Sequence, residues 1–217
     1  MIDVYSDRHG VLKNKLNIKD SKQLEHAERL ITLQNIAQLR KASFDKFDLD
    51  TLKAIHKKIF NSIYNWAGEI RTVNIQKGTM QFCDYSYITE QANEIFKKVA
   101  EQGNFKGLSK DEFCGKAAEL FNNINALHPF REGNGRAQRE FIFHLAKTAG
   151  YELDLNKADK EQYMNASKIG VVNDRPMELL MRSIIKDYQK ENEIEKAKPR
   201  KKKLVIQPKE KSKSRER

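Results

Sequence analysis

The stretch HPFREGNGRAQR, residues 128–139, gathers a histidine, a carboxylate, two glycines and three arginines into one short segment. Apolar residues recur at helical spacing on both sides of it, upstream at 117–127 and downstream at 141–146. The segment is therefore expected to be a loop between two helices, with its glycines leading into the second helix. The N-terminus of a helix presents free backbone N–H groups and a positive dipole end, which favour a bound anion such as phosphate.

Two side chains of this loop suggest chemistry beyond anion binding. Proline disfavours helix in the preceding residue, so the first helix is expected to end at His128 and to place the imidazole at the mouth of the loop. There it could accept a proton from a hydroxyl group, or simply cap the carbonyls of the helix end. Glu132 could ligate Mg²⁺ or remain an exposed loop charge. Phe130 is expected to anchor the loop in the core.

The remaining polar positions fit a phosphate site. Gly133, Asn134 and Gly135 allow a tight turn with inward-pointing amides. Arg136 and Arg139 lie three residues apart on one helical face, where two guanidinium groups could bind phosphate oxygens or form salt bridges. Together these residues predict a nucleoside triphosphate site with a base nearby. The sequence has neither GxxxxGK[ST] nor a GxGxxG following a strand.

The rest of the chain is expected to be mainly α-helical, with one β-hairpin. Helical periodicity or capping signals predict helices over 20–41, 48–68, 88–102, 109–127, 135–150, 158–170 and 176–192. Alternating residues predict strands at 71–75 and 80–83, joined by a turn at 77–79. A single hairpin must pack on the helices, and its free edge could recruit a partner strand.

Composition divides the chain into three parts. The net charge is +11, but residues 196–217 carry eleven basic and two acidic residues, which leaves +2 for residues 1–195. We expect an irregular arm at 1–19, a folded domain at 20–192 and a basic, disordered tail at 193–217. Cys83 and Cys114 lie far apart, which indicates a reducing compartment and unreactive thiols. The sequence contains no long apolar run and no secretory signal peptide.

The string 128–139 matches the Fic motif, HPFx[D/E]GNGRxxR, at every specified position. Residues 55–75 also resemble the segment that precedes this motif in Fic domains, on the strength of Ile55-His56, Tyr64, Trp66-Ala67-Gly68 and Arg71. The resemblance implies the Fic fold, a helical bundle in which a hairpin, here about residues 72–83 and called the flap below, covers the active site. It also implies transfer of AMP from ATP to a hydroxyl of a target protein, called AMPylation.

The resemblance assigns a role to each motif position. His128 would be the general base, and Glu132 would hold Mg²⁺ against the phosphates of ATP. The anion-binding loop and its arginines would bind nucleotide phosphates through Gly133, Asn134, Gly135, Arg136 and Arg139. Lys77 and Gly78 would border the nucleotide at the turn of the flap. The target would dock by strand addition along the flap, at Thr72, Val73, Asn74, Ile75 and Phe82. Relatives that phosphorylate carry Lys in place of the second glycine, whereas this chain has Gly135.

Many Fic proteins are inhibited by a helix with the pattern [S/T]xxxE[G/N], whose glutamate pairs with the second motif arginine. The chain contains four incomplete matches, at Ser21…Glu25, Ser86…Glu90, Thr148…Glu152 and Ser212…Glu216. We therefore expect any inhibition to come from a separate, small antitoxin-like protein.

Several alternatives stay open at the level of sequence. Similar Fic toxins modify bacterial type II topoisomerases, and secreted Fic effectors modify host GTPases, so the chain would act in the cytoplasm or be secreted into a host cell by a non-classical route. The alternative function is a nucleotide- or partner-binding module. Its basic tail would then bind nucleic acid or an acidic membrane, or serve as a secretion signal.

Overall fold

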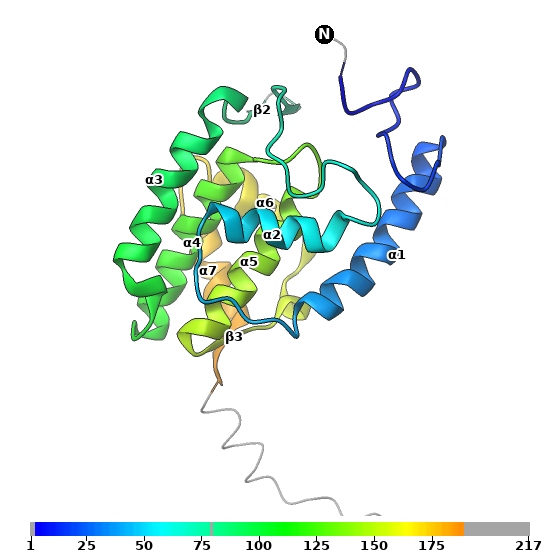
Figure 1. The fold of residues 1–217 in the computed structure, drawn as a ribbon. Helices are drawn as coiled ribbons and strands as arrows, with labels where there is room; N and C mark the ends of the chain where they lie inside the picture. The colour runs from blue at the N-terminus through cyan, green and yellow to red at the C-terminus, as the bar shows by residue number, and fades with distance from the viewer. Residues whose placement is uncertain (1–2, 79, 189–217) are drawn as a thin grey trace, which may run out of the picture.

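The computed structural model describes residues 3–78 and 80–188, which form a mainly helical bundle with two small sheets (Figure 1). This confirms the predicted fold class. The helices in the described part of the chain are α1 (Ser21–Leu39), α2 (Leu49–Phe60), α3 (Ile88–Glu101), α4 (Lys110–Leu127), α5 (Asn134–Ala149), α6 (Lys160–Ile169) and α7 (Arg175–Ile184). The strands are β1 (Gln76–Lys77), β2 (Met80–Gln81), β3 (Tyr151–Leu153) and β4 (Ile185–Asp187), and each sheet is an antiparallel pair, β1–β2 or β3–β4.

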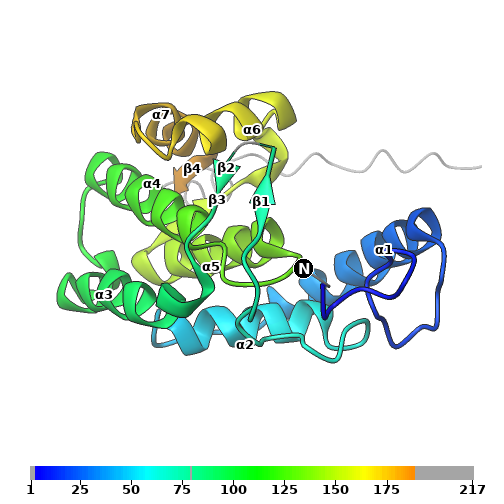
Figure 2. The same ribbon diagram turned by 90° about the horizontal axis from the view of Figure 1, so that it is seen from above.

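Helix α5 lies in the centre of the bundle, between α2 and α4 (Figure 2). Its apolar face is fully buried, with Phe141, Ile142 and Leu145 at 0% exposure. Helices α6 and α7 pack on the α4 side, and α1 packs along α2. Because α4 and α5 are adjacent in the core, the loop that joins them is held at a fixed position on one end of the bundle.

The predicted helix starts at capping residues are confirmed, but the helix predicted over 48–68 is too long, because α2 ends at Phe60. Asp20 and Asp48 accept hydrogen bonds from the first-turn amides of α1 and α2, and Ser109 forms a capping box with Glu112 at the start of α4. Gly150 ends α5 with a φ of 91°, a conformation that favours glycine. Phe130 is completely buried, as expected.

The hairpin is shorter than predicted and is shifted along the chain. Its paired residues are Gln76 with Gln81 and Lys77 with Met80. The prediction of a first strand at 71–75 is therefore wrong. Arg71 prevents that strand, because its backbone N–H donates to the Pro129 carbonyl and its guanidinium binds the Val73 carbonyl. The second strand ends early because the Cys83 amide donates to Ala126 at the end of α4.

The C-terminal prediction of one helix over 176–192 is also wrong within the described residues. Helix α7 ends at Ile184, and β4 then pairs with β3, the strand that follows Gly150. Leu179 on α7 is 52% exposed. In α1, Leu30 is 56% exposed, whereas the polar residues Glu28 and Thr32 are buried.

The N-terminal segment packs on the domain instead of extending from it. Val11 is buried, the Tyr5 ring contacts Trp66 edge-on, and Asp3 forms an ion pair with Arg131 of the loop. Cys83 and Cys114 are both unpaired, and burial raises the pKa of Cys114 to about 11. Within the described part of the chain, no helix has the length and apolar character needed to cross a bilayer. The predicted basic tail at 193–217 lies outside the described residues.

Candidate active site

His128 ends α4 in the left-handed conformation, with φ 45° and ψ 59°. Its Nδ1 lies 3.2 Å from the carbonyl oxygen of Asn125, and a carbonyl can only accept, so Nδ1 carries the proton. Burial, followed by the positive charges of Arg71 and Lys77, lowers the pKa of His128 to about 4. The imidazole is therefore neutral at physiological pH, with the lone pair on Nε2, which is the form required of a proton acceptor.

The loop between the helices is closed by the side chain of Asn134. Its side-chain oxygen accepts from the Phe130 backbone N–H at 2.8 Å, and its side-chain nitrogen donates to the Phe130 carbonyl at 2.7 Å. Gly133 precedes it with a φ of 82°, and its Cα lies directly against the Phe60 ring, leaving no room for a Cβ. Asn134 therefore shapes the loop with its side chain, so a contact to an anion would come from its backbone amide.

The start of α5 offers the backbone donors that the sequence predicts. The amides of Arg136 and Ala137 donate to the Gly133 carbonyl, while those of Asn134 and Gly135, at the first two helical positions, have no acceptor within the helix. Arg139 folds back over this end, with its Nη1 3.4 Å from the position of a Cβ on Gly135. Its guanidinium carbon also lies 5.3 Å from the centre of the Tyr163 ring on α6.

Arg136 has a different environment from Arg139. Its guanidinium forms an ion pair with Glu28 of α1, donates to Thr32 at 3.2 Å and covers the Phe60 ring at 4.7 Å. The Tyr64 hydroxyl donates to the second oxygen of Glu28. The sequence prediction for Arg136 left both a phosphate contact and a salt bridge open, and in this structure the salt bridge is formed.

Glu132 lies at the mouth of the loop with its side chain 46% exposed. One carboxylate oxygen accepts from the Gly133 amide at 2.8 Å and lies 3.6 Å from Arg136. Its backbone is fixed by His56 of α2, a fully buried side chain whose Nε2 donates to the Glu132 carbonyl and whose Nδ1 accepts from the Gly68 amide. Burial lowers the pKa of His56 to about 4, so this pattern of one donor and one acceptor is maintained at neutral pH.

The flap covers the histidine. The Phe82 ring stacks on the His128 imidazole, with centroids 3.7 Å apart and an interplanar angle of 17°. Lys77 and Gly78 are exposed at the hairpin turn, and the positive charge of Lys77 is close enough to affect the pKa of His128.

The other predicted docking residues of the flap lie before β1, outside the paired strands. Thr72 bonds to the Tyr5 hydroxyl, and the Asn74 side chain bonds to Asp84 and to the Tyr85 amide. Val73 and Ile75 are half-buried, and the carbonyl of Ile75 accepts from the Phe82 amide at 3.4 Å.

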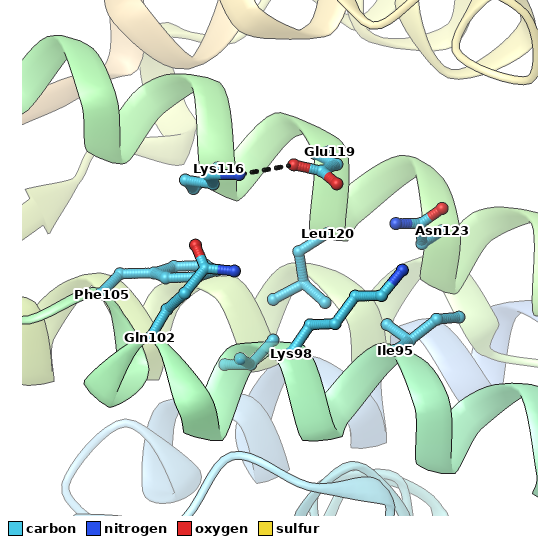
Figure 3. A pocket seen from close by; sticks show the side chains of 9 residues that line it. Ile95, Lys98, Gln102, Phe105, Lys116, Glu119, Leu120 and Asn123 are labelled. Carbon is cyan, nitrogen blue, oxygen red and sulfur yellow. Dashed lines mark hydrogen bonds and ion pairs between the residues drawn. The ribbon is translucent and has the colours of Figure 1, made fainter.

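Two hollows differ in their relation to the loop. A cavity of about 360 Å³ opens between the N-terminal segment, α1 and the loop, and Glu28, Tyr64, Glu132 and Arg136 contribute to its wall. A smaller groove of about 90 Å³ lies between α3 and α4 (Figure 3). Lys116 and Glu119 form an ion pair on the rim of this groove, and no motif residue lines it. Of the motif residues, Glu132 and Arg136 line the first hollow, and His128 lies under the flap.

Sequence reasoning missed the polar partners of the motif that lie far away in the chain. Glu28 and Thr32 are four residues apart on the inward face of α1, so a search for buried polar residues on that face would have found them. The stacking of Phe82 on His128 has no comparable signal, because it depends on the path of the flap.

A family model for the Fic/DOC family matches residues 46–146, which include α2, the flap, α4 and most of α5. The probable protein adenylyltransferase Fic of Escherichia coli is 35% identical over 164 residues, or 76% of this chain and 82% of that protein. The chain belongs to the Fic/DOC family. This confirms the resemblance based on the motif.

Other Fic proteins extend the comparison. The protein adenylyltransferase VbhT of Bartonella schoenbuchensis is 41% identical over 167 residues, which are 76% of this chain but only 35% of VbhT. The Fic domain of a VirB-translocated Bep effector of Bartonella quintana, solved with bound ADP, superposes with a TM-score of 0.83 at 29% identity, covering 86% of this chain and 96% of that domain. The chain is thus a homologue of protein adenylyltransferases and has the fold of their Fic domains.

Proposed function

We propose that this protein transfers AMP from ATP to a serine, threonine or tyrosine hydroxyl of a target protein, with His128 as the general base. The observation that supports this most strongly is the state of His128, a neutral imidazole with its proton fixed on Nδ1 by Asn125. It lies at the end of α4, one short loop before the free amides of α5. The proposed proton acceptor and the amides proposed to bind phosphate are thus carried by the same pair of helices.

In the proposed reaction, Nε2 of His128 takes the proton from the target hydroxyl. The oxygen attacks the α-phosphorus of ATP, the bond from that phosphorus to the bridging oxygen breaks, and pyrophosphate leaves. The amides of Gly133, Asn134 and Gly135 would hold phosphate oxygens, with Arg139 and Arg136 reaching the outer phosphates and Lys77 and Gly78 bordering the nucleotide. A positioned base contributes about 10²–10⁴-fold, and much of the remaining acceleration comes from positioning and charge neutralisation.

The donor set around Glu132 fits Mg²⁺. The carboxylate is half-exposed at the mouth of the loop, and Mg²⁺ is commonly bound by one or two carboxylates together with substrate phosphates and water. When bound, the ion would neutralise charge on the phosphates. His56 keeps the Glu132 backbone in place for this role through the bond to its carbonyl.

The test uses ATP labelled on the α-phosphate, Mg²⁺ and either bacterial or eukaryotic lysate. The protein is expected to label a target with AMP, and His128→Ala is expected to remove the label. His26→Ala, which changes an exposed histidine on α1, is the matched control and is expected to retain it. Labelling that persists in folded His128→Ala would disprove the assigned base. Labelling from γ-labelled ATP instead would indicate phosphorylation.

Regulation by a separate, small antitoxin-like protein is part of this proposal. Within residues 3–78 and 80–188 the recorded ion pairs include none to Arg139, the second motif arginine, and Glu28 pairs with Arg136 instead. We expect the purified chain to be active alone and Glu28→Gln not to increase the rate of transfer. An increase of tenfold or more in Glu28→Gln would mean that the chain inhibits itself through α1.

The flap is the proposed docking site for the target, with Thr72, Val73, Asn74, Ile75 and Phe82 beside the bound segment. Since the paired strands are only two residues long, strand addition would have to extend them along residues 72–75. The relative from Bartonella quintana is described as VirB-translocated, which supports secretion into a host cell as one route for this chain. Labelling in eukaryotic but not bacterial lysate would support that route, and the reverse would support action in the bacterial cytoplasm.

A further inference from the structure

Arg71 is a buried cation that is held only by backbone carbonyl groups. It is 1% exposed, and none of the ion pairs within the described ranges 3–78 and 80–188 includes it. Its Nε donates to the His128 carbonyl at 2.8 Å and its Nη1 to the Val73 carbonyl at 2.7 Å, while Nη2 donates to Leu127 at 3.3 Å and also to Cys83. Burial lowers the pKa of Arg71, and the carboxylate of Asp84 lies near enough to counter this in part without forming an ion pair. Burying a charge outside an ion pair is costly, so a role beyond simple packing is indicated.

The four acceptors belong to two parts of the proposed site, the end of α4 that carries His128 and the flap. Leu127 and His128 are the last residues of α4, where carbonyl groups lack intrahelical donors and the helix dipole is negative. Val73 lies on the entry to the hairpin, and Cys83 lies on its exit. A single planar guanidinium therefore joins the backbone of the base to both ends of the flap.

Neighbouring backbone bonds reinforce the same connection. The Arg71 amide donates to the Pro129 carbonyl at 2.9 Å, directly after His128, and the Cys83 amide donates to Ala126 at 3.0 Å. Phe82, whose ring stacks on the imidazole, directly precedes Cys83. The position of the imidazole and the path of the flap are thus set by shared contacts, and His128 is held in a left-handed conformation that non-glycine residues adopt only when their surroundings require it.

We propose that Arg71 is a positioning residue for the transfer reaction. It holds His128 and the two ends of the flap in fixed positions relative to one another, so that the hydroxyl of a docked target lies next to Nε2 of His128. This inference rests on the proposed AMP transfer, but its site is separate from the nucleotide. The hydrogen bonds recorded for Arg71 go to residues 73, 83, 127, 128 and 129, and not to α5, where the phosphate donors lie.

The main test compares Arg71→Lys and Arg71→Gln with the native protein. Lysine keeps the charge but cannot reach four carbonyls with a planar fork. Both variants are expected to lower kcat/KM for the target protein by about 100-fold, the scale of a 1 Å misplacement of a catalytic group. The Kd for ATP, measured by calorimetry, is expected to change less than threefold. Native kinetics in Arg71→Lys, or an equal loss of ATP binding, would overturn the proposal.

The matched control is Arg40→Lys. Arg40 is a partly exposed arginine at the end of α1 that forms two hydrogen bonds with the buried Glu140. This substitution is expected to lower Tm while kcat/KM stays within threefold of native. If Arg71→Gln does not fold, Arg71→Lys alone decides the result.

A second readout separates this inference from the proposed function. NMR titration of the His128 imidazole is expected to show a pKa near 4 in the native protein and a higher value in Arg71→Lys, because the loosened ring becomes hydrated. If the native protein transfers no AMP, the proposed function fails, and the titration still tests whether Arg71 positions His128. An unchanged titration in Arg71→Lys would then refute the coupling.

Discussion

The two glycines of the loop are expected to tolerate alanine very differently. Gly133 has a φ of 82°, and a Cβ there would overlap ring carbons of Phe60, the fully buried last residue of α2. The left-handed conformation costs alanine roughly 1–2 kcal/mol, and overpacking a core typically costs about 1–3 kcal/mol. Gly133→Ala is therefore expected to lower the free energy of unfolding by about 2–5 kcal/mol, a large part of the stability of an ordinary domain.

Gly135→Ala is the matched control on the same loop. Gly135 is the second residue of α5, and a Cβ there would lie 3.4 Å from Arg139 Nη1, at the edge of ordinary contact with a flexible side chain. Alanine in place of glycine inside a helix gains up to about 1 kcal/mol, so this variant is expected to be as stable as the native protein or more so. Its ATP affinity is expected to fall, because a methyl group in contact with the Arg139 guanidinium takes up space beside the proposed phosphate donors.

Urea denaturation followed by circular dichroism measures both variants, and calorimetry measures ATP binding. Gly133→Ala within 1 kcal/mol of the native protein would refute the steric argument, and so would equal destabilisation by the two variants. Native ATP affinity in Gly135→Ala would refute the assignment of Arg139 to the phosphates.

Three further predictions concern protonation, stacking and the buried ion pair. Burial lowers the pKa values of His56, His128 and His144 to about 4, so the unfolded chain takes up protons that the folded chain does not, and stability is expected to fall as pH decreases from about 6.5 to 4. For His56 alone the loss is about 3 kcal/mol, and urea midpoints that do not change between pH 7 and 4.5 would contradict it. Phe82→Ala is expected to raise the pKa of His128 by exposing the imidazole to water, with NMR titration as the measurement and an unchanged value as the contrary result. Glu28→Gln is expected to lower the free energy of unfolding by about 1–3 kcal/mol, because Arg136 and Tyr64 lose a charged acceptor. The control is Glu25→Gln, which changes an exposed residue on the same helix and is expected to have little effect. Equal urea midpoints for these two variants would contradict the prediction.

Features set by neighbouring residues were predictable from the sequence. Pro129 ends α4 at His128, Gly133 and Gly150 mark the two ends of α5, and Asp20, Asp48 and Ser109 cap their helices. These are local effects of backbone geometry and capping, so a single sequence carries them.

Features set by distant contacts were not predictable in the same way. The strand expected at 71–75 is displaced because Arg71 bonds to carbonyl groups more than fifty residues away, at Leu127 and His128. Strand β4 was predicted to be helical because Ile184 and Ile185 suit either structure, and only the pairing with β3 decides between helix and strand. Within the site, the motif residues were identifiable, but the ion pair from Glu28 to Arg136 joins residues 108 positions apart.

The pairing of β3 with β4 also determines where the last described residues of the chain lie. Strand β4 lies at the end of the bundle opposite the hairpin (Figure 1). A fluorophore, an affinity tag or a second domain joined after residue 188 would therefore be attached away from the flap and the mouth of the loop. A chain tagged at that position can be immobilised with the flap towards solution, which suits capture of a modified target directly from lysate.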